Sequence, residues 1–191
     1  MTRPLKTLTL ASMLCGLALS PATAQQRNSY DRALGLQAGL ADLSSGNEAV
    51  LGANFRFRIA GPPADRDTRG SMRGYLEPEV QYLESDFSVG GLGVSSEDLL
   101  VGLNIVGVVP FGAVDTFFGG GPALHFLDAS SDLTGLDSSD EKFGLNVHVG
   151  VDVHISEAIA LTVAGRLDLI EDAVVDDSQT KVLVGLRFKF R

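Results

Sequence analysis

The sequence contains no tryptophan and a single cysteine, Cys15. Leu14 precedes Cys15 at a position where lipid attachment requires a small residue, so a lipoprotein is not expected. One cysteine can form neither an intramolecular disulfide nor a thiolate metal cluster. Long apolar runs are absent as well, because no stretch after residue 24 reaches the roughly 18 consecutive apolar residues of a helical membrane span. Any insertion into a membrane must therefore use strands.

The first 24 residues have the composition of a cleaved signal peptide. Arg3 and Lys6 make the start positive, an apolar stretch follows, and Ala22 and Ala24 form a small-x-small cleavage pattern. The apolar stretch is short for a membrane anchor, and polar residues follow it at once. We therefore expect a signal peptide at residues 1–24 and one domain at residues 25–191.

The charge balance is acidic. Removal of Arg3 and Lys6 with the signal peptide changes the formal net charge from −9 to −11. Nucleic acid is therefore not expected as a partner. The 45% hydrophobic content is also unlike that of a disordered acidic chain.

Strict alternation of apolar and polar residues is the main structural signal. Between residues 143 and 156 the odd positions are apolar and the even positions are small or polar. Residues 159–169 and 182–190 alternate in the same way. Helical spacing fits none of these segments, so each predicts a strand with one apolar face.

Five earlier segments alternate less cleanly, at residues 34–40, 51–59, 76–82, 99–109 and 114–127. Gly119-Gly120-Gly121-Pro122 interrupts the last of them, and we expect a bulge or bend there because proline cannot donate to a strand ladder. The eight segments together predict an all-β fold, an eight-stranded antiparallel up-and-down transmembrane β-barrel.

The connections between the segments alternate in charge and length. Four of them hold 15 acidic residues and no lysine or arginine: residues 42–48, 84–98, 128–141 and 171–180. The intervening turns, near 60–73, 110–113 and 156–158, are mostly shorter, and the first contains Arg66, Arg69 and Arg73. With an even number of strands, all four acidic loops lie at one end, as in outer-membrane barrels.

The polar face decides which side of the sheet is inside, because a soluble barrel would turn its apolar face inward. Small residues crowd this face: Gly35, Gly39, Gly52, Gly102, Gly119, Gly121, Gly144, Gly150, Ala160, Ala164 and Gly185. On a solvated exterior they would weaken the strands. Inside a narrow barrel they leave room for long side chains, so we expect the apolar face to meet lipid.

The long side chains of the polar face carry both charges. We expect a lumen charge network of Arg56, Arg58, Glu77, Glu79, Arg166, Asp168 and Arg187. Lys181, Lys189, Asp115 and Asp152 join it, which makes six cations against five carboxylates. The hairpin of the second and third segments places Arg56 opposite Glu77 within about one register step. A nearly neutral lumen favours a salt-bridged plug, with a narrow porin-like channel as the alternative.

The signal peptide, the eight segments and the aromatic-terminated last strand from Val182 to Phe190 resemble the OmpA-type and OmpX-type small outer-membrane barrels and the opacity-like porin superfamily. The resemblance covers residues 30–191. It implies a monomer in the outer membrane of a Gram-negative cell envelope, inserted by the barrel-assembly machinery and surrounded by outer-membrane lipid and lipopolysaccharide. No periplasmic domain is expected after the last strand. The aromatic girdles would come from Phe57, Tyr75, Tyr82, Phe111, Phe126 and Phe143.

Three histidines raise the question of a metal site. His148 and His154 share a face but lie about 20 Å apart at the rise of a strand. His125 is expected opposite position 144 and not opposite His148. We therefore expect no metal and no cofactor. The acidic loops do not match an EF-hand, and divalent-cation binding by them stays an open hypothesis.

His154-Ile155-Ser156 followed by Asp168 is similar to the His-x-Ser pair and downstream carboxylate of outer-membrane barrels that deacylate lipid A. Glu157 stands where that family has asparagine, and Asp168 replaces a glutamate. The pair also falls on the lumen face near a periplasmic turn, where lipid cannot reach it. We therefore expect no catalytic residues and a non-enzymatic structural or surface-interaction protein.

Overall fold

A computed structural model of the chain describes residues 30–43, 46–62, 70–89, 92–131, 137–171 and 178–190. The predicted signal peptide and its cleavage site lie outside the described residues. No helix among the described residues has the length and apolar character needed to cross a membrane.

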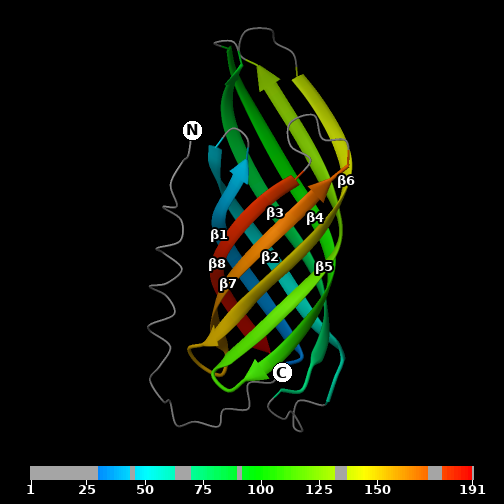
Figure 1. Ribbon diagram of the computed structural model, residues 1–191, viewed down its shortest axis with the longest axis vertical. Coiled ribbons are helices and arrows are strands. Elements are labelled where there is room, and N and C mark those ends of the chain that lie inside the picture. The colour runs from blue at the N-terminus through cyan, green and yellow to red at the C-terminus, as the bar shows by residue number, and fades with distance from the viewer. Residues whose placement is uncertain are drawn as a thin grey trace, which may run out of the picture.

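Eight antiparallel strands form a closed barrel, as predicted (Figure 1). They are β1 (Arg32–Leu43), β2 (Gly46–Ala60), β3 (Arg73–Val89), β4 (Leu92–Phe111), β5 (Val114–Ser131), β6 (Asp137–His154), β7 (Ile159–Ile170) and β8 (Ser178–Phe190). Each strand pairs with the next in sequence, and β1 closes the barrel by pairing with β8. Closure satisfies the backbone of the first and last strands, which would otherwise be free edges.

The strands alternate between lipid-facing and lumen-facing residues, and the apolar residues face outward. In β6, Val147 and Val149 are 55% and 63% exposed, whereas Asn146 and His148, which alternate with them, are buried. A soluble barrel would show the reverse arrangement. The small residues of the inner face make space for long ones, because a Cβ atom added to Gly102 would lie 2.6 Å from Oε1 of Glu79.

The bulge or bend predicted at Gly119–Pro122 does not appear as a shift in strand register. The pairs Gly102–Ala123 and Ile105–Gly120 keep one register between β4 and β5, and the β5–β6 register is also unbroken. The loss of one backbone donor at Pro122 is thus tolerated within a continuous strand. The register shifts instead between Arg58 and Ala60, where β2 meets β3 near a turn.

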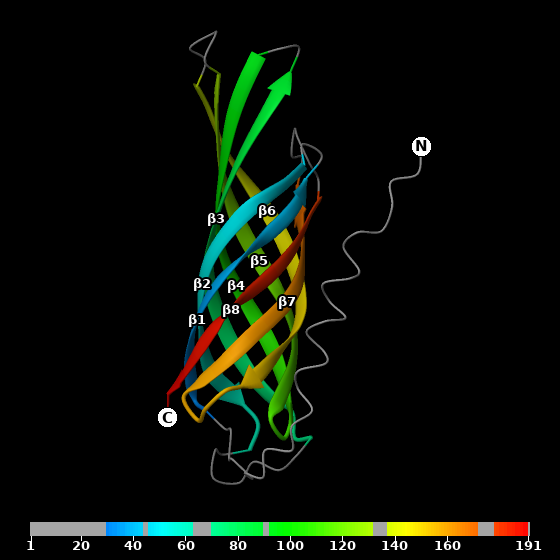
Figure 2. The ribbon, with the colours of Figure 1, turned by 90° about the vertical axis from the view of Figure 1, so that its left-hand side faces the viewer.

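The predicted boundaries of two acidic loops are wrong, because β3 and β4 pair as far as Val89–Leu92, and β5 and β6 as far as Ser130–Asp137. On the flanks, pairing stops earlier, at Val50–Leu83 between β2 and β3 and at Gly144–Ile170 between β6 and β7. Four strands therefore rise past the rest of the barrel (Figures 1 and 2). This extension, residues 84–89, 92–98, 125–131 and 137–142, is called the extended sheet.

Candidate functional site

The lumen holds a balanced set of buried charges. Among the described residues, six cations and six carboxylates are buried: Arg56, Arg73, Arg166, Lys181, Arg187 and Lys189 with Glu77, Glu79, Asp98, Asp115, Asp152 and Asp168. Buried charges are tolerated only when they are paired, so their contacts determine how the barrel interior is organised.

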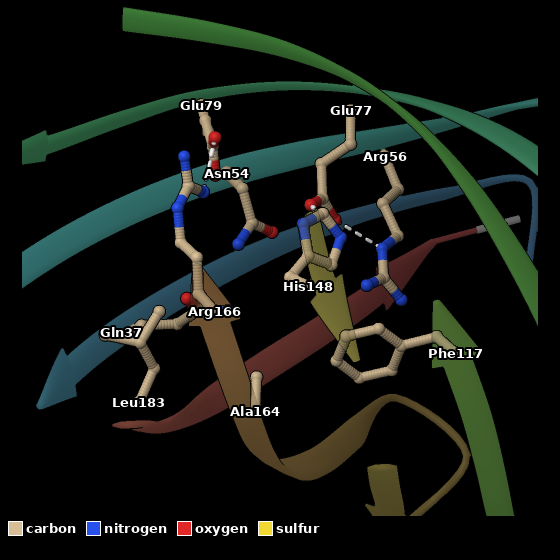
Figure 3. A pocket seen from close by; sticks show the side chains of 10 residues that line it. All are labelled: Gln37, Asn54, Arg56, Glu77, Glu79, Phe117, His148, Ala164, Arg166 and Leu183. Carbon is tan, nitrogen blue, oxygen red and sulfur yellow. Dashed lines mark hydrogen bonds and ion pairs between the residues drawn. The ribbon is translucent and has the colours of Figure 1, made fainter. Parts of the chain in front are cut away.

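The first cluster links four strands across the lumen. Arg56 Nε donates to Glu77 Oε2 (Figure 3). Arg56 Nη1 lies 3.1 Å from Asp152 Oδ2. Arg187 Nε lies 3.1 Å from the same Asp152 oxygen, and Arg187 Nη1 lies 3.5 Å from Glu77 Oε2. The Arg56 guanidinium also lies over the Phe117 ring, 4.4 Å from its centroid. Two arginines and two carboxylates thus join β2, β3, β6 and β8.

The second cluster lies beside the first, toward the extended sheet. Arg166 Nη1 lies 2.5 Å from Glu79 Oε1, and Arg166 Nε lies 2.6 Å from Asp168 Oδ1. Lys181 Nζ lies 2.9 Å from Asp168 Oδ2 and donates to Gln81 Oε1 at 3.3 Å. Six of the seven residues predicted for the lumen charge network, all except Arg58, are therefore brought together in these two clusters.

Arg58 lies apart, at the end of the barrel where Arg32 pairs with Phe190. Its Nε lies 3.3 Å from Asp31 Oδ1, and its Nη2 donates to the Tyr30 carbonyl at 2.8 Å. The register shift after Arg58 marks the same end of β2.

Arg73, assigned from the sequence to a turn, is instead the first residue of β3 and points into the lumen. Its Nη2 lies 3.9 Å from Asp115 Oδ1, and both side chains are buried. Arg73, Glu77 and Glu79 all have odd numbers, so they lie on the same face of one strand. Extending the alternation of β3 back to Arg73 would have indicated that its side chain points inward.

Apolar and aromatic side chains are also buried beside the charge clusters, toward both ends of the barrel. At the end near the termini, Tyr75 stacks on Tyr30 with 5.1 Å between ring centroids, and its hydroxyl donates to the Tyr30 carbonyl at 3.0 Å. Burial raises the pKa of the Tyr30 hydroxyl well above its usual value, so the Tyr30 side chain stays neutral. Toward the extended sheet, Val50 and Leu83 are buried in the lumen. Tyr75 is thus an interior residue, and its predicted place in an aromatic girdle is wrong.

Each histidine of the chain lies beside a carboxylate. His125 Nδ1 is 3.0 Å from Asp98 Oδ2, and His148 Nε2 is 3.7 Å from Glu77 Oε1. His125 pairs with Lys142 in β6, so the expected pairing with position 144 is wrong by two residues. No group of three metal-ligating side chains occurs within the described parts of the chain.

A cavity of about 10 Å³ separates the two clusters, and Asn54, Glu77, Glu79, His148 and Arg166 are among its lining residues (Figure 3). A space of this size holds about one water molecule. The interior at this level is thus filled by side chains.

Solved structures match this architecture. Neisserial surface protein A aligns with a TM-score of 0.58 and 18% identity, over 83% of this chain and 96% of that one. Ail, the attachment invasion locus protein of Yersinia pestis, aligns with a TM-score of 0.54 and 12% identity, over 83% of this chain and 96% of that one. The chain has the fold of the small outer-membrane β-barrels. No protein-family model and no curated protein matches its sequence.

The same barrel fold also occurs in the outer membrane enzyme PagL, which aligns with a TM-score of 0.50 and 12% identity, over 83% of this chain and 99% of that one. The barrel fold therefore does not decide between an enzyme and a non-enzyme, and the side chains must be compared directly.

In this barrel the His154, Ser156 and Asp168 side chains do not converge. His154 Nε2 lies 3.2 Å from Asp115 Oδ2, and its Nδ1 lies 2.6 Å from Lys189 Nζ. Ser156 Oγ accepts the backbone N–H of Ile159 at 3.1 Å within the turn. Asp168 lies eight residues along β7 from Ala160, the partner of His154, or about 26 Å at strand rise. The three residues cannot act on one substrate atom.

Proposed function

We propose that this protein is a non-enzymatic outer-membrane barrel with a structural or surface-interaction role and a lumen closed by its own charges. The observation that carries the proposal is the buried cluster of Arg56, Glu77, Asp152 and Arg187, which ties four strands together across the interior. The fold shared with Neisserial surface protein A and Ail supports the membrane assignment.

In the proposed orientation, the extended sheet stands outside the cell and the termini face the periplasm. The longer connections of outer-membrane barrels face outward, which supports this orientation. The apolar belt is the band of exposed apolar residues around the outside of the barrel, and exposed aromatic residues near both its ends support its placement in a membrane, since girdles mark the two membrane interfaces. Tyr82 and Phe143 lie toward the extended sheet, and Phe57, Phe111 and Phe190 lie toward the termini. The belt between them contacts outer-membrane lipid and lipopolysaccharide.

The membrane assignment is tested by fractionating cells that express the full chain. We expect the protein in the outer-membrane fraction, and we expect its gel migration to change on boiling because an intact barrel stays compact. Recovery as a soluble periplasmic protein would contradict the assignment.

The non-enzymatic role rests on the separation of His154, Ser156 and Asp168. A lipid A deacylase assay of the purified protein should give no activity, with the Ser156→Ala variant indistinguishable from the wild type. Deacylation that disappears in Ser156→Ala would overturn this part of the proposal.

A narrow channel for small solutes is the second candidate, and the polar interior with its small cavity favours it. Its signature would be a steady single-channel current that disappears when Glu77 and Glu79 are neutralised. The paired charges and the apolar side chains buried beside them favour the closed barrel instead.

A further inference from the structure

Lys189 is a buried lysine without a paired carboxylate. The chain after residue 24 contains three lysines, Lys142, Lys181 and Lys189. Lys142 Nζ lies 3.0 Å from Asp140 Oδ2, and Lys181 Nζ lies 2.9 Å from Asp168 Oδ2. Lys189 is only 7% exposed, and among the described residues no carboxylate forms an ion pair with it. Removal from water activates a lysine amine as a nucleophile, so Lys189 differs chemically from the other two.

The Lys189 amine contacts an imidazole in place of a carboxylate. Its Nζ lies 2.6 Å from His154 Nδ1 and 3.5 Å from the Ser156 carbonyl oxygen. On the other side of the ring, His154 Nε2 lies 3.2 Å from Asp115 Oδ2. A carboxylate beside Nε2 holds the imidazole proton there, which leaves Nδ1 as an acceptor toward Lys189. A nucleophile, a base and a group that orients the base thus lie in one row.

This row lies at the end of the barrel that holds the C-terminus (Figure 1). Lys189 pairs with Ala33 near the start of β1, and its backbone N–H donates to the Ala158 carbonyl at 2.7 Å. Ala158 belongs to the turn between β6 and β7, where Glu157 and Ala158 are exposed. The amine therefore lies beside a solvent-exposed turn, and its small exposed surface restricts access to small molecules.

The charges around the amine favour an uncharged reagent. The Asp115 and Asp152 carboxylates and the Arg73 guanidinium all act electrostatically on Lys189. Because groups of both signs surround the amine, a charged reagent of either sign meets repulsion and also loses its hydration on entry. An uncharged reagent avoids both costs.

We infer that Lys189 is a covalent modification site for small, uncharged aldehydes. The Nζ lone pair attacks the carbonyl carbon and forms a carbinolamine. His154 Nδ1 carries the two amine protons, one after the other, to the former carbonyl oxygen, which leaves as water. A carbon–nitrogen double bond to Lys189 remains, and no oxidant or reductant is needed. The inference goes beyond the proposed function and does not depend on it, because one aldehyde modifies one chain without turnover.

The test treats the full-length protein with dilute acetaldehyde at neutral pH, in phosphatidylcholine nanodiscs whose lipid has no primary amine. Borohydride converts each imine to a stable ethyl-lysine, and peptide mass spectrometry gives the rate at each lysine. Lys189 should react at least about tenfold faster than Lys142, since an ion-paired, partly exposed lysine is almost entirely protonated at neutral pH. Lys181, which is buried but ion-paired, should stay unmodified. Boiling in SDS should remove these differences.

His154→Gln keeps a polar side chain but removes the proton acceptor, and it should slow modification of Lys189 at least about tenfold. The matched control is His125→Gln, which changes a buried histidine at the other end of the barrel. Its Lys189 rate should stay within about twofold of the wild type. Heat-modifiable migration shows that each variant is folded, and the comparison of the three lysines needs no variant.

Glyoxylate, an anionic aldehyde of similar size, tests the preferred reagent class and should react with Lys189 several-fold more slowly than acetaldehyde. Three results would overturn the inference: a Lys189 rate no higher than that of Lys142 in the folded wild type, an unchanged rate in folded His154→Gln, or faster reaction with glyoxylate than with acetaldehyde.

Discussion

Arg56 and Glu77 face each other across the β2–β3 ladder, and their side chains are hydrogen bonded inside the barrel. Their exposed fractions are 0% and 3%, so water does not screen the pair. Arg187 and Asp152 complete the charge balance around them. The pair therefore stabilises the closed barrel only as long as both members are present.

Glu77→Gln should lower the free energy of unfolding by about 3–5 kcal/mol, because it leaves buried arginines without one of their carboxylates. The matched control is Glu84→Gln, an exposed glutamate of the same strand, for which we expect a change within about 0.5 kcal/mol. Urea unfolding in lipid bilayers, followed by heat-modifiable migration, measures both. Equal effects of the two substitutions would show that the buried network contributes nothing specific.

Replacing both Arg56 and Glu77 by apolar residues, as in Arg56→Met with Glu77→Leu, should cost less than Glu77→Gln alone. The double change removes one charge of each sign, whereas the single change leaves charges unpaired. The same unfolding assay decides the order, and a double variant less stable than the single variant would contradict it.

Gly102→Val should destabilise the barrel by about 1–3 kcal/mol, because its Cβ would overlap the Glu79 carboxylate that Arg166 binds. Gly165→Val is the matched control, since a Cβ there meets nothing within 4 Å. We expect the control to be as stable as the wild type or slightly more stable. The thermal midpoint of the heat-modifiable transition is a sufficient measurement, and equal midpoints for the two variants would contradict this account of the inner face.

Val147→Arg should cost about 2–4 kcal/mol if this exposed valine meets lipid near the middle of the belt. Ser139→Arg lies on the same strand outside the belt and should cost about 0–1 kcal/mol. The comparison is made by unfolding in bilayers. Similar costs at the two positions would place Val147 in water.

Much of the barrel was predictable because a bilayer imposes one polarity on each strand face. Within the belt the alternation predicts eight strands, and the predicted hairpin brings Arg56 to within about one register step of Glu77. Residues 84–98 and 128–141 show no regular alternation of apolar and polar residues, so the sequence predicts loops where β3–β6 extend as strands. The predictions for Tyr75 and Arg73 are wrong because both residues lie at the end of a strand. The aromatic ring of Tyr75 suggests a girdle and the turn beside Arg73 suggests a loop, although the period of two places both side chains inside.

The contacts inside the lumen were less predictable than the strands. Arg56 and Glu77 lie on neighbouring strands, so the distance between them depends on the register of a single hairpin. Arg56 and Asp152 lie on β2 and β6, and the distance between them depends on barrel closure and on the shear of all eight strands. A sequence pattern therefore indicates which charges enter the lumen, while their pairing requires the closed structure.

The central claim, a barrel closed by its own side chains, is tested most directly by recording single-channel currents from the purified full-length protein in planar bilayers, with an open porin as the positive control. We predict no steady current from the wild type at neutral pH. A steady wild-type current that disappears in the Glu77→Gln, Glu79→Gln double variant would contradict the closed barrel and establish a channel.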